Sequence, residues 1–104
     1  MRQNRRNAKI GVGARLGQHF FKTPWGARAL ARAADITGDD TVLEIGPGKG
    51  ALTRELLSGS KKVVAIEKDE ARVEKLREKF AQEISTNALT VISGDIRDIT
   101  PKKL

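Results

Sequence analysis

The chain has 104 residues, 38% of them hydrophobic and 32% charged, and a formal net charge of +7. This length excludes two independent domains, and the chain has neither an apolar run near the ~18 residues of a membrane-spanning helix nor the apolar stretch of a secretory signal. The absence of Cys excludes disulfides and thiolate metal sites, and it fits a cytoplasmic protein. Because there is also only one His, we expect no metal site. Without a long apolar run we expect no membrane partner.

The positive charge is concentrated at the N-terminus. Residues 1–34 contain eight basic residues and no acidic one, whereas the remaining residues contain 12 basic and 13 acidic residues. This asymmetry indicates a polyanionic partner at one end of the molecule. Residues 1–15 show no apolar periodicity, and we expect a flexible arm there. The side chains of this arm that we expect to contact the phosphates of such a partner are Arg2, Arg5, Arg6 and Lys9.

Elements with a clear pattern follow the arm. Thr23 and Pro24 predict a helix start, because Thr caps helices and Pro is favoured at the first helical position. This helix is expected to stop at Gly38. Its expected apolar face consists of Trp25, Ala29, Leu30 and Ala33.

Short apolar runs then alternate with helical patterns. We predict strands at 41–45, 62–67 and 89–93, with helices at 51–57 and 69–84 between them. The apolar stripe of the second of these helices consists of Val73, Leu76, Phe80 and Ile84. This alternation predicts an α/β fold with parallel strands and right-handed crossovers.

A glycine-rich loop joins the first strand to the helix after it. Gly46-Pro47-Gly48-Lys49-Gly50 allows a sharp turn and the close approach of a ligand to the main chain. Glu67 ends the second strand, where a carboxylate can accept hydrogen bonds from both hydroxyls of a ribose. Asp95 follows the third strand, where it can accept from a base amino group. In open α/β sheets, ligands bind at these carboxyl ends.

The glycine spacing has two interpretations. Read as Gly46-x-Gly48-x-x-Ala51, it is a nicotinamide or flavin fingerprint. Read as Glu44-x-Gly46-x-Gly48-x-Gly50, it is the S-adenosylmethionine loop of class I methyltransferases. The second interpretation is favoured because it also accounts for Glu44, Gly50 and the Gly94-Asp95 pair. Pro47 fits poorly in a dinucleotide turn, where backbone N–H groups face the pyrophosphate.

Four segments of the chain carry a resemblance to a known family. They are residues 16–21 (Leu-Gly-Gln-His-Phe-Phe), 42–53, 64–69 and 94–96. In this order they resemble the ribosomal RNA adenine N6-dimethyltransferases, over about residues 15–99. The resemblance implies a class I, Rossmann-like methyltransferase fold and S-adenosylmethionine as cofactor. It also implies ribosomal RNA as substrate. The family includes enzymes that act on small-subunit RNA and enzymes that act on large-subunit RNA, and of these two substrates we favour the small-subunit RNA.

The resemblance assigns roles to individual residues. The implied cofactor-binding residues are His19, Phe21, Gly46, Gly48, Glu67 and Asp95. His19 and Phe21 would line the site, the glycines would lie near the methionine part, Glu67 would hold the ribose and Asp95 the adenine amino group. We assign residues 1–22 to a basic arm that includes a cofactor-site segment. Residues 23–104 are assigned to a partial S-adenosylmethionine-binding domain.

The family's catalytic motif, Asn-Leu/Ile-Pro-Tyr/Phe, does not occur in these 104 residues, so no catalytic residue is predicted. The C-terminal half of the expected seven-stranded sheet is absent too, and the strand at 41–45 is expected to be an exposed edge. We therefore expect a truncated fragment that is inactive alone. The alternatives are a non-catalytic module for RNA and S-adenosylmethionine, and part of a nicotinamide-dependent oxidoreductase.

Overall fold

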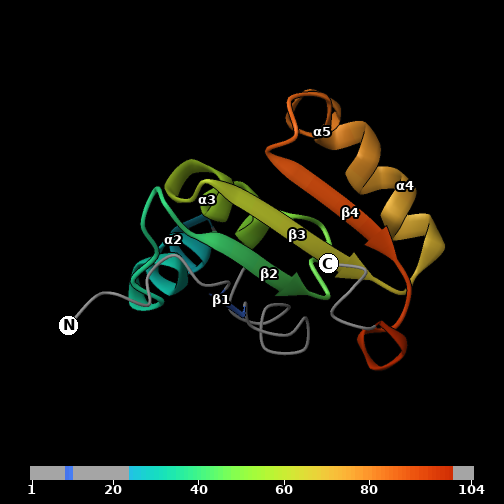
Figure 1. Cartoon of the computed structure of the whole chain (residues 1–104), viewed down its shortest axis with the longest axis horizontal. Coiled ribbons are helices and arrows are strands. Elements are labelled where there is room, and N and C mark those ends of the chain that lie inside the picture. The colour runs from blue at the N-terminus through green and yellow to red at the C-terminus, as the bar shows by residue number, and fades with distance from the viewer. Residues whose placement is uncertain (1–8, 11–23, 100–104) are drawn as a thin grey trace.

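The computed structural model describes residues 9–10 and 24–99. Its strands are β1 (Lys9–Ile10), β2 (Thr41–Ile45), β3 (Lys62–Glu67) and β4 (Leu89–Ser93). Its helices are α2 (Pro24–Ala33), α3 (Ala51–Gly59), α4 (Glu70–Lys79), α5 (Ala81–Ser85) and the 3-10 turn η1 (Ile96–Asp98). Figure 1 shows that helices and strands alternate along the chain after α2. All three strands predicted from the sequence have the predicted bounds.

The strands form one parallel sheet in the order β1-β2-β3-β4. Its register pairs Ile45 with Ile66 across β2 and β3, and Glu67 with Ser93 across β3 and β4. The three longer strands therefore end at the same level. This sheet confirms the predicted α/β fold with parallel strands.

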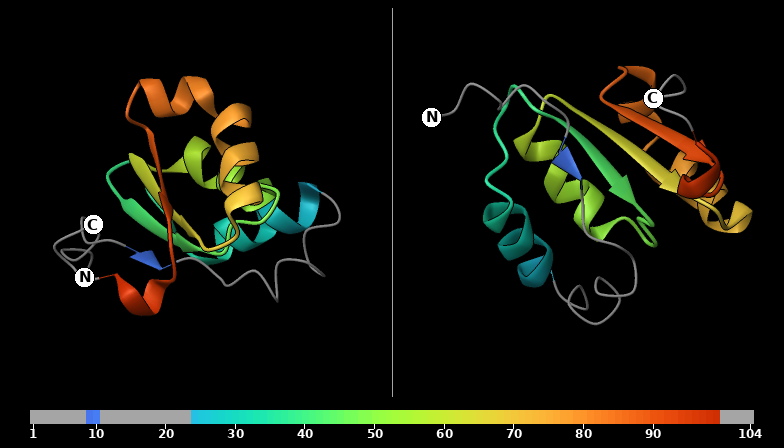
Figure 2. Two further views of the ribbon diagram at one scale, coloured as in Figure 1. Left: turned by 90° about the vertical axis from the view of Figure 1, so that its right-hand side faces the viewer. Right: turned by 60° about the horizontal axis from the view of Figure 1, so that its bottom comes forward.

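The N-terminal strand β1 corrects two expectations. Lys9 and Ile10 pair with Val42 and Leu43 on the side of β2 opposite β3 (Figures 1 and 2). The predicted arm is therefore not flexible throughout, and the start of β2 is not an open edge. A strand of two residues leaves no periodicity in the sequence. It forms here because the N–H and C=O groups along a strand edge pair with any extended backbone that reaches them.

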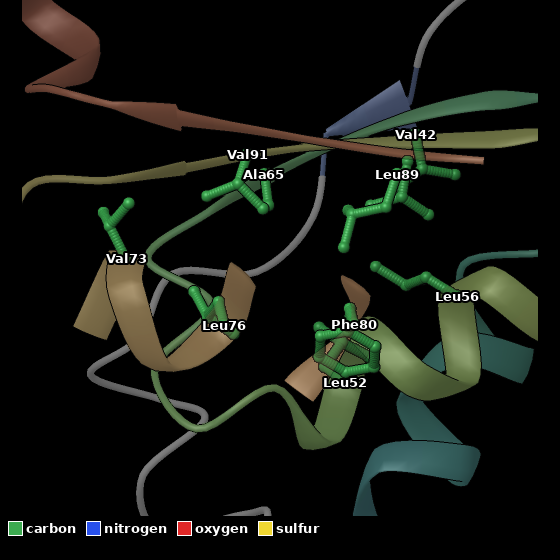
Figure 3. Close-up of a cluster of buried hydrophobic side chains, with 10 residues drawn as sticks. Val42, Leu52, Leu56, Ala65, Val73, Leu76, Phe80, Leu89 and Val91 are labelled. Atoms are coloured by element: carbon green, nitrogen blue, oxygen red, sulfur yellow. The ribbon is translucent and has the colours of Figure 1, made fainter. Parts of the chain in front are cut away.

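The core lies between one face of the sheet and the helices (Figure 3). Figure 3 shows strand side chains pointing down from the sheet onto side chains of α3 and α4 that point up. The buried residues of this cluster are Val42, Leu52, Leu56, Val63, Ala65, Val73, Leu76, Phe80, Leu89 and Val91. This packing fixes α3 directly after the glycine loop, and so fixes the loop itself.

Helix α2 differs from the prediction in its inward face and its end. Ala27 is fully buried and Leu30 and Ala31 pack on the core, whereas Ala33 is exposed. The helix ends at Ala33 rather than near Gly38, because Asp35 adopts a left-handed conformation with φ 56°. Asp is one of the few residues that tolerate this conformation, so the stop did not require glycine.

The helix predicted at 69–84 is two helices that meet at Phe80. Phe80 has φ −112° and ψ 31°, which ends α4 and begins α5. The helical hydrogen bonds continue through the bend, from Phe80 N–H to Leu76 C=O and from Ile84 N–H to Phe80 C=O. The bend therefore turns the axis without a loop. The predicted stripe is otherwise confirmed, because Val73, Leu76 and Phe80 are buried and Ile84 packs on the core.

Candidate functional site

The carboxyl ends of β2, β3 and β4 bring the predicted loop and its two acids to one edge of the sheet. The N–H of Gly46 donates to the carbonyl of Ile66 at 2.8 Å, and the N–H of Gly94 donates to the carbonyl of Glu67 at 2.9 Å. Gly46 thus lies beside the end of β3, and Asp95 follows one residue after Gly94. Figure 2 shows η1, which begins after Asp95, beside the arrowheads of β3 and β4. The edge is where ligands of open α/β sheets bind.

The backbone of the glycine loop explains its alternating glycines. Gly46, Gly48 and Gly50 have φ values of 69°, 60° and 90°, a region that residues with a Cβ rarely adopt. At Gly48 an added Cβ would meet no atom of residues 9–10 or 24–99 within 4 Å. The main chain at Gly48 therefore borders open space, where a ligand can approach it closely.

At Gly50 the loop instead lies against the core. An added Cβ would lie 2.7 Å from Cε2 of Phe80 and 3.2 Å from Cδ2 of Leu76, and both side chains are buried. The N–H of Arg54 donates to the Gly50 carbonyl at 3.0 Å, which begins α3. Gly50 is therefore required by both its conformation and its neighbours.

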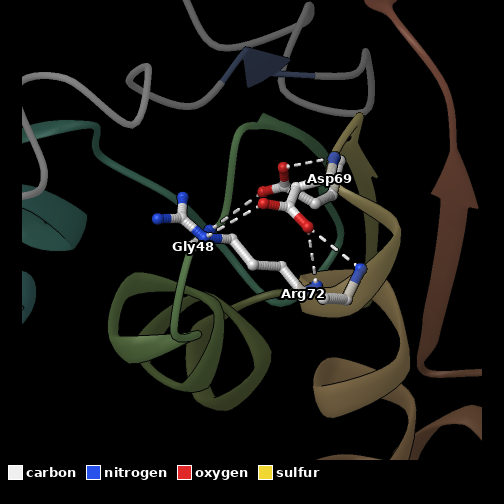
Figure 4. Close-up of polar contacts among 5 residues, drawn as sticks. Gly48, Asp69 and Arg72 are labelled. Atoms are coloured by element: carbon white, nitrogen blue, oxygen red, sulfur yellow. Dashed lines mark hydrogen bonds and ion pairs between the residues drawn. The ribbon is translucent and has the colours of Figure 1, made fainter.

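Glu67 connects the glycine loop to the start of α4. Figure 4 shows the two backbone groups that it joins, those of Gly48 and Asp69. Its Oε1 accepts from the N–H of Gly48 at 3.3 Å, and its Oε2 accepts from the N–H of Asp69 at 3.0 Å. The residue is 4% exposed. Asp69 in turn caps α4 by accepting from the N–H groups of Ala71 and Arg72. The Glu67 carboxylate is thus held at the strand end by two backbone donors, and each of its oxygens has a further acceptor position.

Glu44 lies under the loop and connects β2 to α3. The residue is 1% exposed, and its Oε1 accepts from the Thr53 hydroxyl at 2.6 Å. The pKa of Glu44 is raised to about 7, mainly by burial; the Thr53 hydrogen bond opposes this rise, and the negative charge of Glu67 adds to it. The contact spans the whole glycine loop, so it fixes the two ends of the loop relative to each other.

Asp95 is held by Arg97, two residues further on. Its Oδ1 accepts from the backbone N–H of Arg97 at 2.9 Å and from Nε at 3.0 Å, and its Oδ2 accepts from Nη2 at 2.6 Å. The donors of Arg97 hold the pKa of this carboxyl well below its usual range. The Asp95 side chain is 21% exposed, so part of its carboxylate is open to a ligand.

Comparison with known proteins identifies the family. The model of the family described as ribosomal RNA adenine dimethylase matches residues 12–104. The chain belongs to the ribosomal RNA adenine dimethylase family. Among curated relatives, a ribosomal RNA small subunit methyltransferase A of Dehalococcoides mccartyi is 46% identical over 86% of this chain and 30% of its own length. A ribosomal RNA small subunit methyltransferase of Arabidopsis thaliana is 41% identical over 77% of this chain and 23% of its own.

Two solved structures have a similar fold. A dimethyladenosine transferase from Plasmodium falciparum is 35% identical with a TM-score of 0.67, over 76% of this chain and 28% of that one. The 23S rRNA methyltransferase ErmE is 31% identical with a TM-score of 0.69, over 77% of this chain and 32% of that one. The chain thus spans roughly a quarter to a third of the length of the relatives it matches.

Several predicted residues of this family member lie outside the residues that the structure describes. They are His19, Phe21, Arg2, Arg5 and Arg6. The predicted boundary between residues 22 and 23 lies outside them too, and Lys9 is described only as part of strand β1. Their roles stay predictions.

The structure adds two site residues that the sequence interpretation left without a role, Thr53 and Arg97. Thr53 had a signal, because it follows Glu44 by nine residues and so falls in the first turn of the helix after the loop. Arg97 had none, because an arginine two residues after an aspartate is common on protein surfaces.

Two other features are absent from residues 9–10 and 24–99. These residues contain no group of three or more His, Cys, Asp or Glu side chains placed to hold a metal ion. None of the helices described there has the length and apolarity needed to span a membrane.

Proposed function

We propose that the chain supplies the S-adenosylmethionine-binding part of a ribosomal RNA adenine N6-dimethyltransferase. The observation that carries the proposal is the sheet register, which gathers the glycine loop, Glu67 and Asp95 at one edge. Membership of the ribosomal RNA adenine dimethylase family supports the activity. The cofactor is supported by the family resemblance together with these residue types in this order.

The residues at the edge fit this cofactor. Glu67 has acceptor positions for two ribose hydroxyls while the two backbone donors hold it in place. The open space beside Gly48 admits a ligand against the main chain. Asp95 presents an ionised carboxylate to an adenine amino group, which is a hydrogen-bond donor. When bound, S-adenosylmethionine supplies a methyl group that is already activated for transfer to nitrogen.

The proposed substrate is small-subunit ribosomal RNA, and the proposed location is the cytoplasm. The names of the relatives, which include small subunit methyltransferases from a plant and a bacterium, support the substrate. The basic residues at the N-terminus support contact with RNA phosphates, which would be independent of RNA sequence. The candidates are Arg2, Arg5, Arg6 and Lys9.

Calorimetric titration of the 104-residue chain tests the cofactor assignment. We expect S-adenosylmethionine to bind and NAD not to bind. Glu67→Gln exchanges one acceptor oxygen for a donor, and the loss of a charged hydrogen bond, about 1.5–3 kcal/mol, predicts at least tenfold weaker binding. The control is Glu74→Gln, at an exposed position of α4, which should bind as the unmodified chain does. NAD binding without S-adenosylmethionine binding would contradict the assignment.

A non-catalytic module that binds RNA and S-adenosylmethionine is the second candidate. It is favoured by one observation, that the 104 residues contain no Asn-x-Pro-aromatic motif. Transfer of a radiolabelled methyl group to small-subunit ribosomal RNA separates the two. We expect the chain alone to bind the cofactor without measurable transfer, with activity returning when the chain is part of a protein that carries the motif. Turnover by the chain alone would exclude the module.

A further inference from the structure

The Arg97 guanidinium binds the Asp95 carboxylate, which in the proposed function binds the adenine of the cofactor. Its Nε lies 3.0 Å from Oδ1 and 3.2 Å from Oδ2 of Asp95, and its Nη2 lies 2.6 Å from Oδ2. Both carboxylate oxygens are therefore engaged by one guanidinium. This fork geometry is the stronger form of an arginine–carboxylate pair.

An adenine amino group and a guanidinium require the same partner. Both are donors, and a guanidinium has no acceptor. The backbone N–H of Arg97 takes a further position on Oδ1, at 2.9 Å. An ionised carboxylate offers about four acceptor positions, and these contacts use most of them. An incoming amino group therefore competes with the Arg97 side chain.

The Arg97 side chain can leave without disturbing Asp95. It is 82% exposed, and within the described residues its guanidinium contacts Asp95. The η1 turn is held by backbone bonds instead, from the N–H of Arg97 to Asp95 Oδ1 and from the N–H of Asp98 to the Asp95 carbonyl. Asp95 thus stays in position when the guanidinium swings into solvent.

We propose that Arg97 sets the base preference of the cofactor site by competing with the 6-amino group of adenine for Asp95. This proposal rests on the proposed function. A purine with a 6-oxo group, such as hypoxanthine, has an acceptor at that position and can accept from the guanidinium rather than displace it. Arg97 therefore weakens the binding of adenine and favours the binding of 6-oxopurines. As a result, the difference between the affinities of the site for these two bases becomes smaller.

The test measures the affinity of the full chain for S-adenosylhomocysteine and for its inosine counterpart, S-inosylhomocysteine. Because exposed ion pairs are weak, we expect Arg97→Ala to bind the adenine compound about two- to fivefold tighter. We expect it to bind the inosine compound more weakly. The dissociation constant of the inosine compound divided by that of the adenine compound should therefore rise about tenfold. Arg97→Lys, which keeps a donor without the fork, should give an intermediate ratio. Arg77→Ala is the control, because its guanidinium bonds the β4 carbonyl of Val91 instead of Asp95, and its ratio should not change.

A second measurement needs no variant. Raising the ionic strength from about 50 mM to about 500 mM screens the exposed Arg97–Asp95 pair, so the ratio for the unmodified chain should move toward that of Arg97→Ala. If the ratio of the two dissociation constants is the same in Arg97→Ala as in the unmodified chain, and salt does not change it, the role of Arg97 is overturned. In that case, binding of the adenine compound would still support the proposed function. Failure of the unmodified chain and of Arg97→Ala to bind either compound would instead overturn the proposed function, and the role of Arg97 with it.

Discussion

Two carboxylates beside the glycine loop are held in different ways. Glu67 accepts from two backbone N–H groups, which are fixed by the fold, whereas Glu44 accepts from the single hydroxyl of Thr53. Glu44 is also almost completely buried, and burial is the main reason that its pKa rises to about 7. The Glu44 carboxyl is therefore expected to be partly protonated near neutral pH, with its charge state linked to folding.

This linkage predicts how stability depends on pH. The folded-state pKa of Glu44, about 7, lies above its ordinary value of 4.5, so the folded chain holds the proton more tightly. The Glu44 contribution to stability is complete below about pH 4.5, falls as the pH rises toward 7, and is constant above that. The loss is on the order of 3 kcal/mol. The side chain of Glu44→Gln cannot ionise, so this variant should lose less stability between pH 5 and pH 8 than the unmodified chain does. Urea unfolding at the two pH values measures the free energy of unfolding.

Glu74→Gln is the matched control for this measurement, because Glu74 is exposed on α4. Its stability should change between pH 5 and pH 8 as that of the unmodified chain does. Equal pH dependence in Glu44→Gln and Glu74→Gln would show that the Glu44 carboxylate stays ionised in the folded chain.

The bend between α4 and α5 supports the site at the scale of the elements. It buries the Phe80 ring against the glycine loop, and the Lys79 ammonium donates to the Lys49 carbonyl at 2.9 Å. The cations of Arg54 and Lys79 lie 5.1 and 5.6 Å from the centre of that ring, within the range of cation–π attraction. The end of α4 therefore stabilises a loop that lies 30 residues earlier in the chain.

Gly50→Ala tests this support. The alanine would have to adopt a φ of 90° and would place its Cβ 2.7 Å from the buried Phe80 ring. Strained backbone and overpacking together predict a loss of about 2–4 kcal/mol in the free energy of unfolding, measured by urea denaturation. Gly59→Ala is the control with the opposite sign. Gly59 ends α3, and within the part of the chain that the structure describes no atom lies within 4 Å of an added Cβ. Alanine should therefore stabilise the helix by up to about 1 kcal/mol. A Gly50→Ala chain as stable as the original would contradict the proposed support.

Over the whole molecule, the parts that were predictable from the sequence depend on local patterns. The strands at 41–45, 62–67 and 89–93 are short apolar runs bounded by glycine or charge, and their bounds were correct. The sequence also predicted that the glycine loop, Glu67 and Asp95 lie together, because the carboxyl ends of parallel strands meet at one edge of the sheet. The bend at Phe80 and the Arg97–Asp95 pair depend on tertiary or side-chain contacts that leave no period in the sequence, and β1 depends on an edge that exists only in the folded sheet.

The N-terminal segment combines two properties that its sequence does not separate. Lys9 and Ile10 pair with the edge of β2, which fixes where the segment meets the body of the molecule. The arginines before them belong to a stretch without acidic residues. Sheet pairing depends on the backbone, while attraction to phosphate depends on the side-chain charge. Removing charge without shortening the chain therefore tests RNA binding while leaving the strand in place.

The last prediction concerns the charge asymmetry of the whole chain. Replacing three arginines by glutamine should weaken binding to a labelled small-subunit RNA fragment. It should also reduce the slope of log affinity against log salt concentration by about 2, because each of three phosphate contacts with a single strand contributes about 0.7 to that slope. The replaced residues are Arg2, Arg5 and Arg6. Fluorescence anisotropy at several salt concentrations measures the slope. The control replaces three exposed cations outside the arm, namely Lys61, Lys75 and Arg77. An equal reduction of the slope in both variants would mean that RNA contacts the body as much as the N-terminal segment.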